Sequence, residues 1–507
     1  MNTSDKTMYK WNEINWQKLE RNVFKLQKRI YQASQSNDKK RVNRLQKLLL
    51  SSTSARLLSV RRVAQINNGK KTAGVDGVKS INQDQRLDLS IKLNLGEKSR
   101  PSRRVWIPKP GKSEKRPLGI PTMTDRAKQA LGKLALEPEW EAKFEPNSYG
   151  FRPARSCHDA IEAIFKGIRQ KNAYVLDADI KGCFDNIDHT ALLKKLNTFP
   201  KLRRIIKKWL SSGIMDENVF QETNAGTPQG GVISPLLANI ALHGLEYETK
   251  KALSVDLFQY MKDTKGRASN MDAQRNISII RYADDFVIIH ESKEIIQKAK
   301  QFVEEWLKQV GLTLNGEKSR IIHTLRSENN LKSGFCFLGF SIRQYFISNR
   351  IRKYVTHIKP SPEGQKRHMK RIREVLKSNL GVSQKDIIMK LNPIINGWSN
   401  YYKTAVSSEI FSRMDKDMFY KLWKWSRYRH SSKGKKWIKQ KYFRGYKGNT
   451  WRFIAPHGLL LAYHCDTHIK RHVKIQGTRT PYDGEVVYWT KRFGKLTTVR
   501  DLAKRCI

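Results

Sequence analysis

The order of apolar and polar residues predicts helices in the first part of the chain. Between positions 11 and 66, apolar residues recur at helical intervals, and lysines and arginines fill many of the positions between them. The clearest apolar stripe is formed by Leu19, Val23, Leu26 and Ile30. Such a stripe is typical of helices that pack on a core, so we expect solvated basic faces here, with only a hint of RNA contact. The two glycines of Lys71–Gly77 end this helical region.

The stretch Ile277–His290 has instead the pattern of two strands joined by a tight turn. Two runs of β-branched and aromatic residues flank a short centre, Tyr282–Asp285, which predicts a hairpin with Asp284 and Asp285 at its tip. Adjacent carboxylates repel each other and lose hydration on burial, and a bound divalent cation relieves both costs. Aspartate is also a common turn residue, so this stretch alone supports a metal site and a plain turn equally.

A second strand pattern that carries carboxylates lies about a hundred residues upstream. The residues of Tyr174–Asp185 alternate until a Lys-Gly pair turns the chain, and this places Asp177 and Asp179 on one face. A strand ending in a carboxylate, beside a hairpin tip with two more, can surround a pair of Mg²⁺ ions. Such ions, roughly 4 Å apart, serve in-line nucleotidyl transfer by activating a 3′-hydroxyl and holding a triphosphate. The two stretches together favour a metal site built from carboxylates of both.

Two further segments have the composition of loops that contact phosphates or approach a ligand closely. Arg103–Pro121 contains two short apolar strands around a turn rich in lysine and arginine, which suits a triphosphate or a nucleic-acid backbone. Gly226–Asn239 is a glycine-rich turn that leads into an apolar helix, and Gly230 and Gly231 permit close backbone approach. The second pattern is common at loop–helix junctions and is a weak signal by itself.

The net charge of the chain gives the clearest indication of its partner. The 507 residues include 98 Lys and Arg against 46 Asp and Glu, a net charge of +52, and this excess predicts a polyanionic partner. The length indicates more than one domain, and 39% hydrophobic residues suffice for real cores. No apolar run approaches the roughly 18 residues of a membrane-spanning helix, and Met1–Lys10 lacks a signal-peptide core. Nucleic acid is therefore favoured over a membrane surface.

The five cysteines are scattered and include no Cys-x-x-Cys pair, which fits a reducing cytosol and gives no support to a disulfide framework. A zinc cluster can be drawn from His464, Cys465, His468 and His472, but the spacing matches no standard site, so we expect no zinc.

The last part of the chain concentrates the positive charge. Positions 366–507 carry 33 Lys and Arg against 9 Asp and Glu, a net charge of +24. Lys421–Lys447 has eleven basic residues, no acidic residue and seven aromatics, a mixture that suits phosphate pairing with stacking on unpaired bases, although some of these rings belong to a local core. The residues that we expect to bind nucleic acid are Arg427, Arg429, Lys435, Lys436, Lys439, Lys441, Arg444, Trp437 and Tyr442.

Taken together, these stretches resemble the group II intron-encoded reverse transcriptases, also called maturases, over nearly the whole chain and in the same order. Lys71–Gly77 resembles the block that precedes the fingers, and Arg103–Pro121 resembles the fingers hairpin. Tyr282–Asp285 is similar to the signature tetrapeptide of the family, and Leu391–Tyr402 resembles part of its helical thumb.

The resemblance implies roles for individual residues. Lys109 and Arg116 would hold the incoming triphosphate, and Phe184 would exclude a 2′-hydroxyl and so select deoxynucleotides. Asp179, the Ile180 carbonyl and Asp284 would be the metal ligands, with Asp285 shaping the site. Gln229 and Gly230 belong to the template-and-nucleotide block Pro228–Gly231, and Lys318 lies where polymerases carry an acid that protonates pyrophosphate.

The resemblance also implies a fold and a domain order. We expect an α+β right-hand polymerase, with an antiparallel palm sheet, a helical thumb and a basic DNA-binding tail. The expected boundaries are a helical N-terminal extension at 1–95, fingers and palm at 96–345, a thumb or maturase X domain at 346–430, and a basic D-like region at 431–507.

The implied function combines two activities. As an enzyme, the protein would be an RNA-directed DNA polymerase with two Mg²⁺ ions that uses dNTPs and a DNA primer end during retrohoming. As a maturase, it would bind its own intron RNA and assist splicing, in a bacterial cytoplasmic ribonucleoprotein that also meets a target DNA. Many relatives continue into an HNH nuclease with paired Cys-x-x-Cys sites, which this sequence lacks, so we expect no endonuclease activity. Retron, diversity-generating and CRISPR-linked reverse transcriptases remain the alternative, as does a maturase that acts mainly as a splicing factor.

Overall fold

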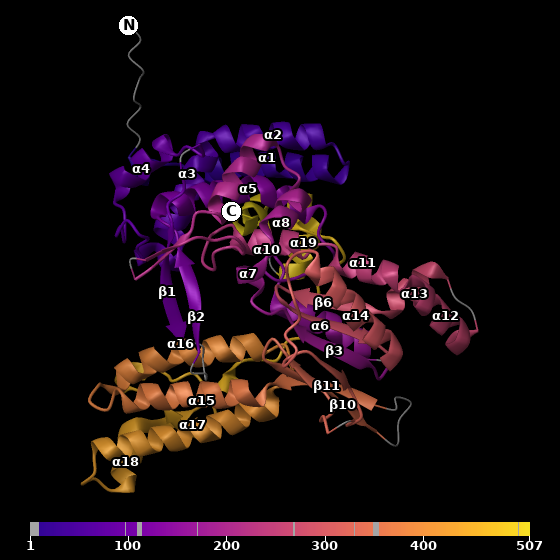
Figure 1. Cartoon of the computed structure of the whole chain (residues 1–507). Helices are drawn as coiled ribbons and strands as arrows, with labels where there is room; N and C mark the ends of the chain where they lie inside the picture. Colours follow the sequence, from indigo (N-terminus) through magenta and orange to yellow (C-terminus); the bar gives the residue numbers. More distant parts are fainter. Residues whose placement is uncertain are drawn as a thin grey trace. The chain divides into compact units, whose positions relative to one another are not determined.

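The structure is a computed structural model of the chain, and it describes residues 10–96, 98–108, 114–169, 171–217, 219–266, 269–328, 330–347, 354–494 and 496–506 (Figure 1). These residues form two compact units. The first contains segments 1–160, 176–321 and 475–507, and the second contains segments 161–175 and 322–474.

The first unit holds most of the helices. They are α1 (Trp16–Gln35), α2 (Lys39–Ser51), α3 (Thr53–Arg61), α4 (Gln83–Lys92), α5 (Met123–Glu141), α7 (Cys183–Asn186), α8 (His189–Leu196), α9 (Pro200–Leu210), α10 (Ser234–Ala241), α11 (Leu245–Ala252), α12 (Ser254–Lys265), α13 (Asn270–Asn276), α14 (Lys293–Lys308), α19 (Val486–Phe493) and α20 (Val499–Cys506). Its strands are β1 (Ser102–Pro108), β2 (Lys115–Ile120), β4 (Ile214–Asp216), β5 (Val219–Gln221), β6 (Ser278–Tyr282) and β7 (Asp285–His290). Three elements run from one unit into the other: α6 (Cys157–Ile168), β3 (Tyr174–Asp179) and β8 (Arg320–His323).

The second unit is a small sheet followed by a helical bundle and a hairpin. Its elements are β9 (Phe335–Phe337), β10 (Phe340–Phe346), β11 (Tyr354–Pro360), α15 (Pro362–Lys377), α16 (Gln384–Tyr402), α17 (Ser408–Arg429), α18 (Lys435–Tyr442), β12 (Phe443–Tyr446) and β13 (Asn449–Phe453). The prediction of antiparallel sheets and a helical C-terminal region is confirmed. The expected boundaries at 95, 345 and 430 stay predictions, and the compact units divide the chain differently.

The N-terminal helices pack on α5, as the apolar stripe of α1 predicts. Val23 and Ile30 are fully buried in a core that also contains side chains of α2, α3 and α5. The ribbon shows α1 and α2 lying close to α5 (Figure 1). Polar groups pair across this interface, since the Gln27 side chain donates to the Leu134 carbonyl and the Ser34 hydroxyl donates to the Glu139 carbonyl. Helix α5 is buried on nearly all sides, which makes it the central element of this part of the unit.

Two four-stranded sheets frame the region that the sequence singled out. One has the order β2-β1-β4-β5, with β1 and β2 paired as an antiparallel hairpin. The other has the order β6-β7-β3-β8, so the strand that ends at Asp179 is the direct neighbour of the strand that begins at Asp285. This neighbourhood positions the candidate site.

The last 33 residues of the chain, 475–507, belong to the first unit. Tyr482 is fully buried, stacks on Phe24 and Tyr31 of α1, and donates a hydrogen bond to Glu137 of α5. Trp489 is also fully buried. This segment therefore packs onto the N-terminal helices, a contact between chain ends that no local pattern predicts.

Candidate active site

The two carboxylates of the signature tetrapeptide lie at the turn of a buried hairpin, as predicted. Strands β6 and β7 pair antiparallel in the register Tyr282 to Asp285, which leaves Ala283 and Asp284 as a two-residue turn. Ala283 has a φ of 59°, and tight hairpin turns of this length require such left-handed values. The turn fixes the backbone of Asp284 at the end of the hairpin.

A second loop of the chain holds this turn in place. The Arg281 backbone exchanges hydrogen bonds with the loop, because its N–H donates to the Asn147 carbonyl and its carbonyl accepts from Tyr149 N–H, both at 2.9 Å. Gly150 lies so close to the turn that a Cβ there would meet the Ala283 nitrogen at 2.4 Å. Only glycine fits this approach without a backbone shift.

The buried guanidinium of Arg281 ties the turn to the helix that follows the glycine-rich block. Its Nη1 donates to Oδ1 of Asn239 at 3.0 Å and to the Ala283 carbonyl at 3.1 Å. Asn239, on α10, donates in turn to the Gly150 carbonyl. The side chain of Arg281 is only 3% exposed, so these bonds form in a desolvated setting where they hold geometry well.

Asp179 stands at the end of β3 and has its own support. The segment after α14 is fixed to it, since Asn315 N–H donates to the Asp179 carbonyl at 2.8 Å and Ile180 forms an isolated antiparallel bridge with Leu314. The Asp179 carboxylate accepts from the Lys318 ammonium at 2.5 Å and from the Asn315 amide at 3.3 Å. Asp179 and Lys318, chosen separately from sequence, therefore meet.

The carboxylates act on one another electrostatically. Burial raises the pKa of Asp284, and the nearby charge of Asp179 adds to the effect. Burial likewise raises the pKa of Asp285 to about 7, with contributions from Asp284, Asp179 and Asp177. The pKa of Asp177 rises to about 6, again mainly through burial. A cluster of partly buried acids that resists full ionisation is a site that binds positive charge.

The residues suit a divalent metal ion. Carboxylate and carbonyl oxygens are the hard ligands that Mg²⁺ prefers, and Asp179, Asp284 and the Ile180 carbonyl would supply them. Among the described residues, no three His, Cys, Asp or Glu side chains form a group that could hold a metal ion. The expected set has only two acidic side chains. The fit therefore depends on the convergence of Asp179 and Asp284, with the Lys318 ammonium at Asp179 as the present counter-charge.

The predicted nucleotide-binding residues lie on the β1–β2 hairpin and the glycine-rich block. Arg116, on β2, is exposed and close enough to lower the pKa of both Asp284 and Asp185 against the effect of burial. Lys109 lies outside the described residues. The block itself is joined to the hairpin, because Gly119 N–H donates to the Gln229 carbonyl at 2.6 Å.

Gly230 is needed at that junction. Its φ is 117°, and a Cβ there would meet the Gly119 carbonyl at 2.5 Å. The Gln229 amide donates to the Asp185 carboxylate at 3.1 Å, which connects the block to the segment after β3. Phe184 in that segment is half-buried and meets Phe151 edge-on, with ring centroids 6.3 Å apart. Gln229, Gly230 and Phe184 thus lie in one connected framework.

Sequence reasoning missed several residues of the site. Arg281 and Asn239 hold the backbone beside Asp284, and Asn315 holds the Asp179 carboxylate, yet each is an ordinary residue type in its local stretch. The one available signal was the arginine inside an otherwise apolar strand, because a buried arginine requires specific partners.

The predicted nucleic-acid-binding residues of the second unit divide into two groups. Arg427, Lys435, Lys436, Lys441 and Arg444 are exposed, and Lys439 is half-buried over the Trp451 ring. Arg429 instead donates to two backbone carbonyls, Trp437 packs partly buried against the core, and Tyr442 is 2% exposed inside it. The Tyr442 ring therefore has no face open to a base.

One of the histidines considered for zinc, His464, forms a hydrogen-bonded chain with two other buried residues. His464 hydrogen-bonds through Nδ1 to Asp415 at 2.6 Å and through Nε2 to His368 at 2.8 Å. All three are buried at the contact between the bundle and the segment that follows β13. The arrangement is a buried hydrogen-bonded chain.

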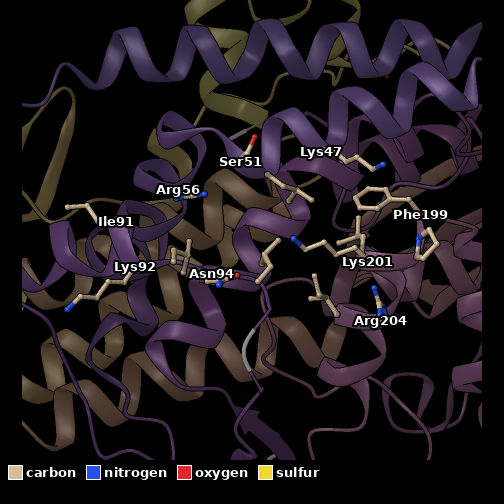
Figure 2. Close-up of a pocket in the computed structure, with 15 residues that line it drawn as sticks. Lys47, Ser51, Arg56, Ile91, Lys92, Asn94, Phe199, Lys201 and Arg204 are labelled. Atoms are coloured by element: carbon tan, nitrogen blue, oxygen red, sulfur yellow. The ribbon is translucent and has the colours of Figure 1, made fainter. Parts of the chain in front are cut away.

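A basic cleft opens among the N-terminal helices, within the first unit. It has a volume of about 830 Å³ and is bordered by α2, α3, α9 and the segment after α4 (Figure 2). Its basic residues are Lys47, Arg56, Lys92, Lys201 and Arg204, and none of the lining residues that the structure describes is acidic. Lys92 pairs with Asp88, whereas the Nε atom of Arg56 is buried without a hydrogen-bond partner. The cleft suits a phosphate-bearing ligand.

No helix in the described part of the chain combines the length and the apolar character that crossing a membrane requires.

Three families of known proteins match consecutive parts of the sequence. Residues 107–342 match "Reverse transcriptase (RNA-dependent DNA polymerase)", residues 11–93 match "N-terminal domain of reverse transcriptase", and residues 365–443 match "Group II intron, maturase-specific domain". Together they cover the candidate active site, the N-terminal helices and most of the helical bundle.

Individual proteins are also similar to this chain in sequence. Protein YkfC of Escherichia coli (strain K12) is 32% identical over 325 residues, which are 58% of this chain and 82% of that protein. Group II intron-encoded protein LtrA of Lactococcus lactis subsp. cremoris is 32% identical over 331 residues, 55% of this chain and 53% of LtrA. An uncharacterized 91 kDa protein in the cob intron of Schizosaccharomyces pombe is 30% identical over 399 residues, 66% of this chain and 47% of that protein. The chain thus spans about half the length of the last two relatives.

Proposed function

The chain belongs to the group II intron-encoded reverse transcriptases and maturases, and we propose that it performs RNA-directed DNA synthesis at Asp179 and Asp284. The observation that carries this proposal is the electrostatic proximity of two carboxylates from distant positions in the sequence, one at the end of β3 and one in the turn before the neighbouring strand β7. The proposed substrates are dNTPs, an RNA template and a DNA primer end, which during retrohoming is supplied by the target DNA.

The metal chemistry follows the general two-ion scheme. Reverse transcriptases use divalent metal ions, and we propose Mg²⁺, which when bound lowers the cost of generating the attacking alkoxide and of charge on the leaving pyrophosphate. Asp179, Asp284 and the Ile180 carbonyl would hold it. Asp285, with its raised pKa, would adjust the charge of the site through its repulsion with Asp284.

The chain's other residues would bind and orient the nucleotide. Arg116, on the β1–β2 hairpin, brings a permanent positive charge near the carboxylates and suits the triphosphate. Lys109, which lies outside the described residues, stays the second cation expected to hold the triphosphate. Phe184 presents a half-buried ring held edge-on by Phe151, a rigid wall against a 2′-hydroxyl. Lys318 would exchange its contact with Asp179 for the leaving pyrophosphate and donate a proton there.

Substitution of the carboxylates tests the enzyme proposal. Asp179→Asn and Asp284→Asn keep the side-chain shape and remove the negative charge, so each should abolish primer extension on an RNA template. RNA affinity should stay near that of the wild type, because it depends on the basic surfaces. Near-wild-type extension by both variants would refute the assignment.

The second proposed activity is binding of the intron RNA to assist splicing, in a ribonucleoprotein. Support comes from the net charge of +52 and from the cleft of Figure 2, whose described lining holds five basic residues and no acidic one. Helices α15–α17 would form the maturase thumb, and the basic region after them would contact the target DNA.

Charge removal in the cleft separates splicing from polymerisation. The double variant Arg56→Gln, Lys201→Gln should weaken RNA binding, flatten its salt dependence and impair splicing, while Asp284→Asn leaves splicing intact. A matched control is Lys300→Gln on α14, a half-buried lysine outside the cleft. Loss of splicing in Asp284→Asn alone would contradict this division of roles.

A further inference from the structure

A groove runs between two helices of the bundle in the second unit. It lies between α15 and α17, which pack side by side (Figure 1), and has a volume of about 500 Å³. Its floor is apolar, because Leu376 and Trp425 are 4% and 3% exposed and belong to the core of the bundle. The other lining residues are Arg373, Lys377, Leu380, Tyr420, Lys421, Lys424 and Tyr428.

Both walls of the groove are positively charged. Arg373 and Lys377 are one helical turn apart on α15, and Lys421 and Lys424 face them from α17. None of the described residues that line the groove is acidic. Within the described residues none of these four cations forms an ion pair, so their charge is open to a ligand from outside the chain.

Two tyrosines stand exposed along the same groove. Tyr420 and Tyr428 are 57% and 68% exposed, although tyrosine rings usually bury most of their apolar surface. Together with Lys424 they form a row at intervals of four residues on α17, and the Cα atoms of the two tyrosines are about 12 Å apart along the helix axis. Ring, cation and ring therefore alternate above an apolar floor.

We propose that this groove binds an unpaired polynucleotide strand, with bases stacked on Tyr420 and Tyr428 and phosphates paired with the four cations. Stacking on aromatic rings combined with cations along the backbone is the general mode of single-strand binding. A duplex would satisfy the cations but keeps its bases stacked inside, away from the rings. An acidic peptide would pair with the cations, but its carboxylates would not stack on the tyrosine rings or cover the apolar floor.

The inference rests on the nucleic-acid binding of the proposed function and adds to it a defined single-strand site. RNA and DNA strands share the chemistry that this groove recognises. A preference for RNA would identify the intron as the source of the strand, and a preference for DNA would identify the target.

The test uses the full chain with its polymerase site occupied by excess RNA–DNA template–primer duplex. The probes are fluorescent 12-nucleotide oligouridylate and oligothymidylate, and binding is followed by anisotropy. The double variant Tyr420→Ala, Tyr428→Ala should weaken binding of at least one probe roughly tenfold or more, given the usual contribution of base–aromatic stacking. Tyr420→Phe, Tyr428→Phe should retain near-wild-type affinity, because phenylalanine keeps the stacking face.

Charge and position are tested in parallel. Lys421→Gln, Lys424→Gln should lower the slope of log affinity against log salt by about 1.4, because each phosphate that a cation neutralises on a single strand contributes about 0.7. The matched control is Tyr247→Ala, a tyrosine with 63% exposure on α11 and outside the groove, which should bind normally. Primer extension by the tyrosine variants on a short template should stay unchanged, so failure of this inference is distinguishable from failure of the polymerase proposal.

Two results would overturn the inference. One is unchanged oligonucleotide binding by the double alanine variant, with its fold verified by circular dichroism. The other is an equal loss of affinity for a 12-base-pair duplex or a hexaglutamate peptide, which would show that the groove recognises charge alone.

Discussion

The Lys318 ammonium donates a hydrogen bond to Asp179 at 2.5 Å, across 139 positions of sequence. Asp179 ends β3, whereas Lys318 lies in the segment after α14 that is attached to the end of that strand. The pKa of Lys318 is raised by this hydrogen bond, so the ammonium stays protonated beside the carboxylate that is proposed to bind metal.

Removal of this ammonium should change the metal requirement. Because Lys318 competes with a divalent cation for Asp179, Lys318→Gln should lower the Mg²⁺ concentration for half-maximal primer extension several-fold. The maximal rate should also fall, since the leaving pyrophosphate loses a proton donor. Titration of Mg²⁺ under single-turnover conditions measures both effects. A titration curve identical to that of the wild type would show that Lys318 has neither role.

The buried guanidinium of Arg281 should matter for rate more than for substrate affinity. Arg281→Met removes the hydrogen bonds to Asn239 and to the Ala283 carbonyl, so the backbone of Asp284 loses its support. We expect kcat to fall about 10- to 100-fold with a smaller change in KM, since misplaced catalytic groups cost rate. Arg275→Gln, a surface arginine on α13, is the matched control and should act normally. A change in KM alone would contradict a positioning role.

The C-terminal segment should stabilise the first unit through one buried ion pair. Arg492 and Asp159 are 6% and 0% exposed, lie 3.0 Å apart, and connect α19 to the start of α6. Arg492→Met leaves the Asp159 charge buried without this partner and should lower the free energy of unfolding by about 3–5 kcal/mol. Denaturant unfolding and proteolysis of the C-terminal segment measure the loss. The double variant with Asp159→Asn should recover part of it, and no recovery would mean that the pair does not act as a unit.

Acid should destabilise the second unit through His368. Burial, helped by the neighbouring His464, lowers the pKa of His368 from 6.5 to about 3. The unfolded chain therefore takes up this proton first, so the contribution is complete above pH 6.5 and is lost as the pH falls from 6.5 towards 3. The slope is at most about 1.4 kcal/mol per pH unit. In melting experiments from pH 7 to 4, His368→Gln should lose stability less steeply than the wild type, and parallel curves would contradict the assignment.

Local patterns were sufficient to predict the hairpin that carries Asp284 and Asp285 and the apolar stripe of α1. Runs of β-branched residues predict the two strands of Ile277–His290. The helical interval of the apolar residues from Leu19 to Ile30 indicates which face of α1 is buried. Both signals arise within a few residues, where side-chain periodicity maps directly onto burial.

Long-range packing explains what those patterns could not predict. The basic composition around Tyr442 favoured nucleic-acid contact, yet its ring belongs to the core because neighbouring helices and β13 supply partners for it. Tyr482 packs on α1 from the other end of the chain, and the groove beside Tyr420 and Tyr428 depends on how α15 meets α17. Each of these features depends on a contact between two separate segments of the chain. Local sequence patterns do not indicate which segments are in contact.

The most direct test of the account is primer extension by Asp179→Asn and Asp284→Asn, each compared with the wild type on the same RNA template and DNA primer. Loss of extension by at least a thousandfold in both variants, with unchanged RNA affinity, is the predicted result. Extension within about tenfold of the wild type in either variant would contradict the claim that these two carboxylates jointly hold the catalytic metal.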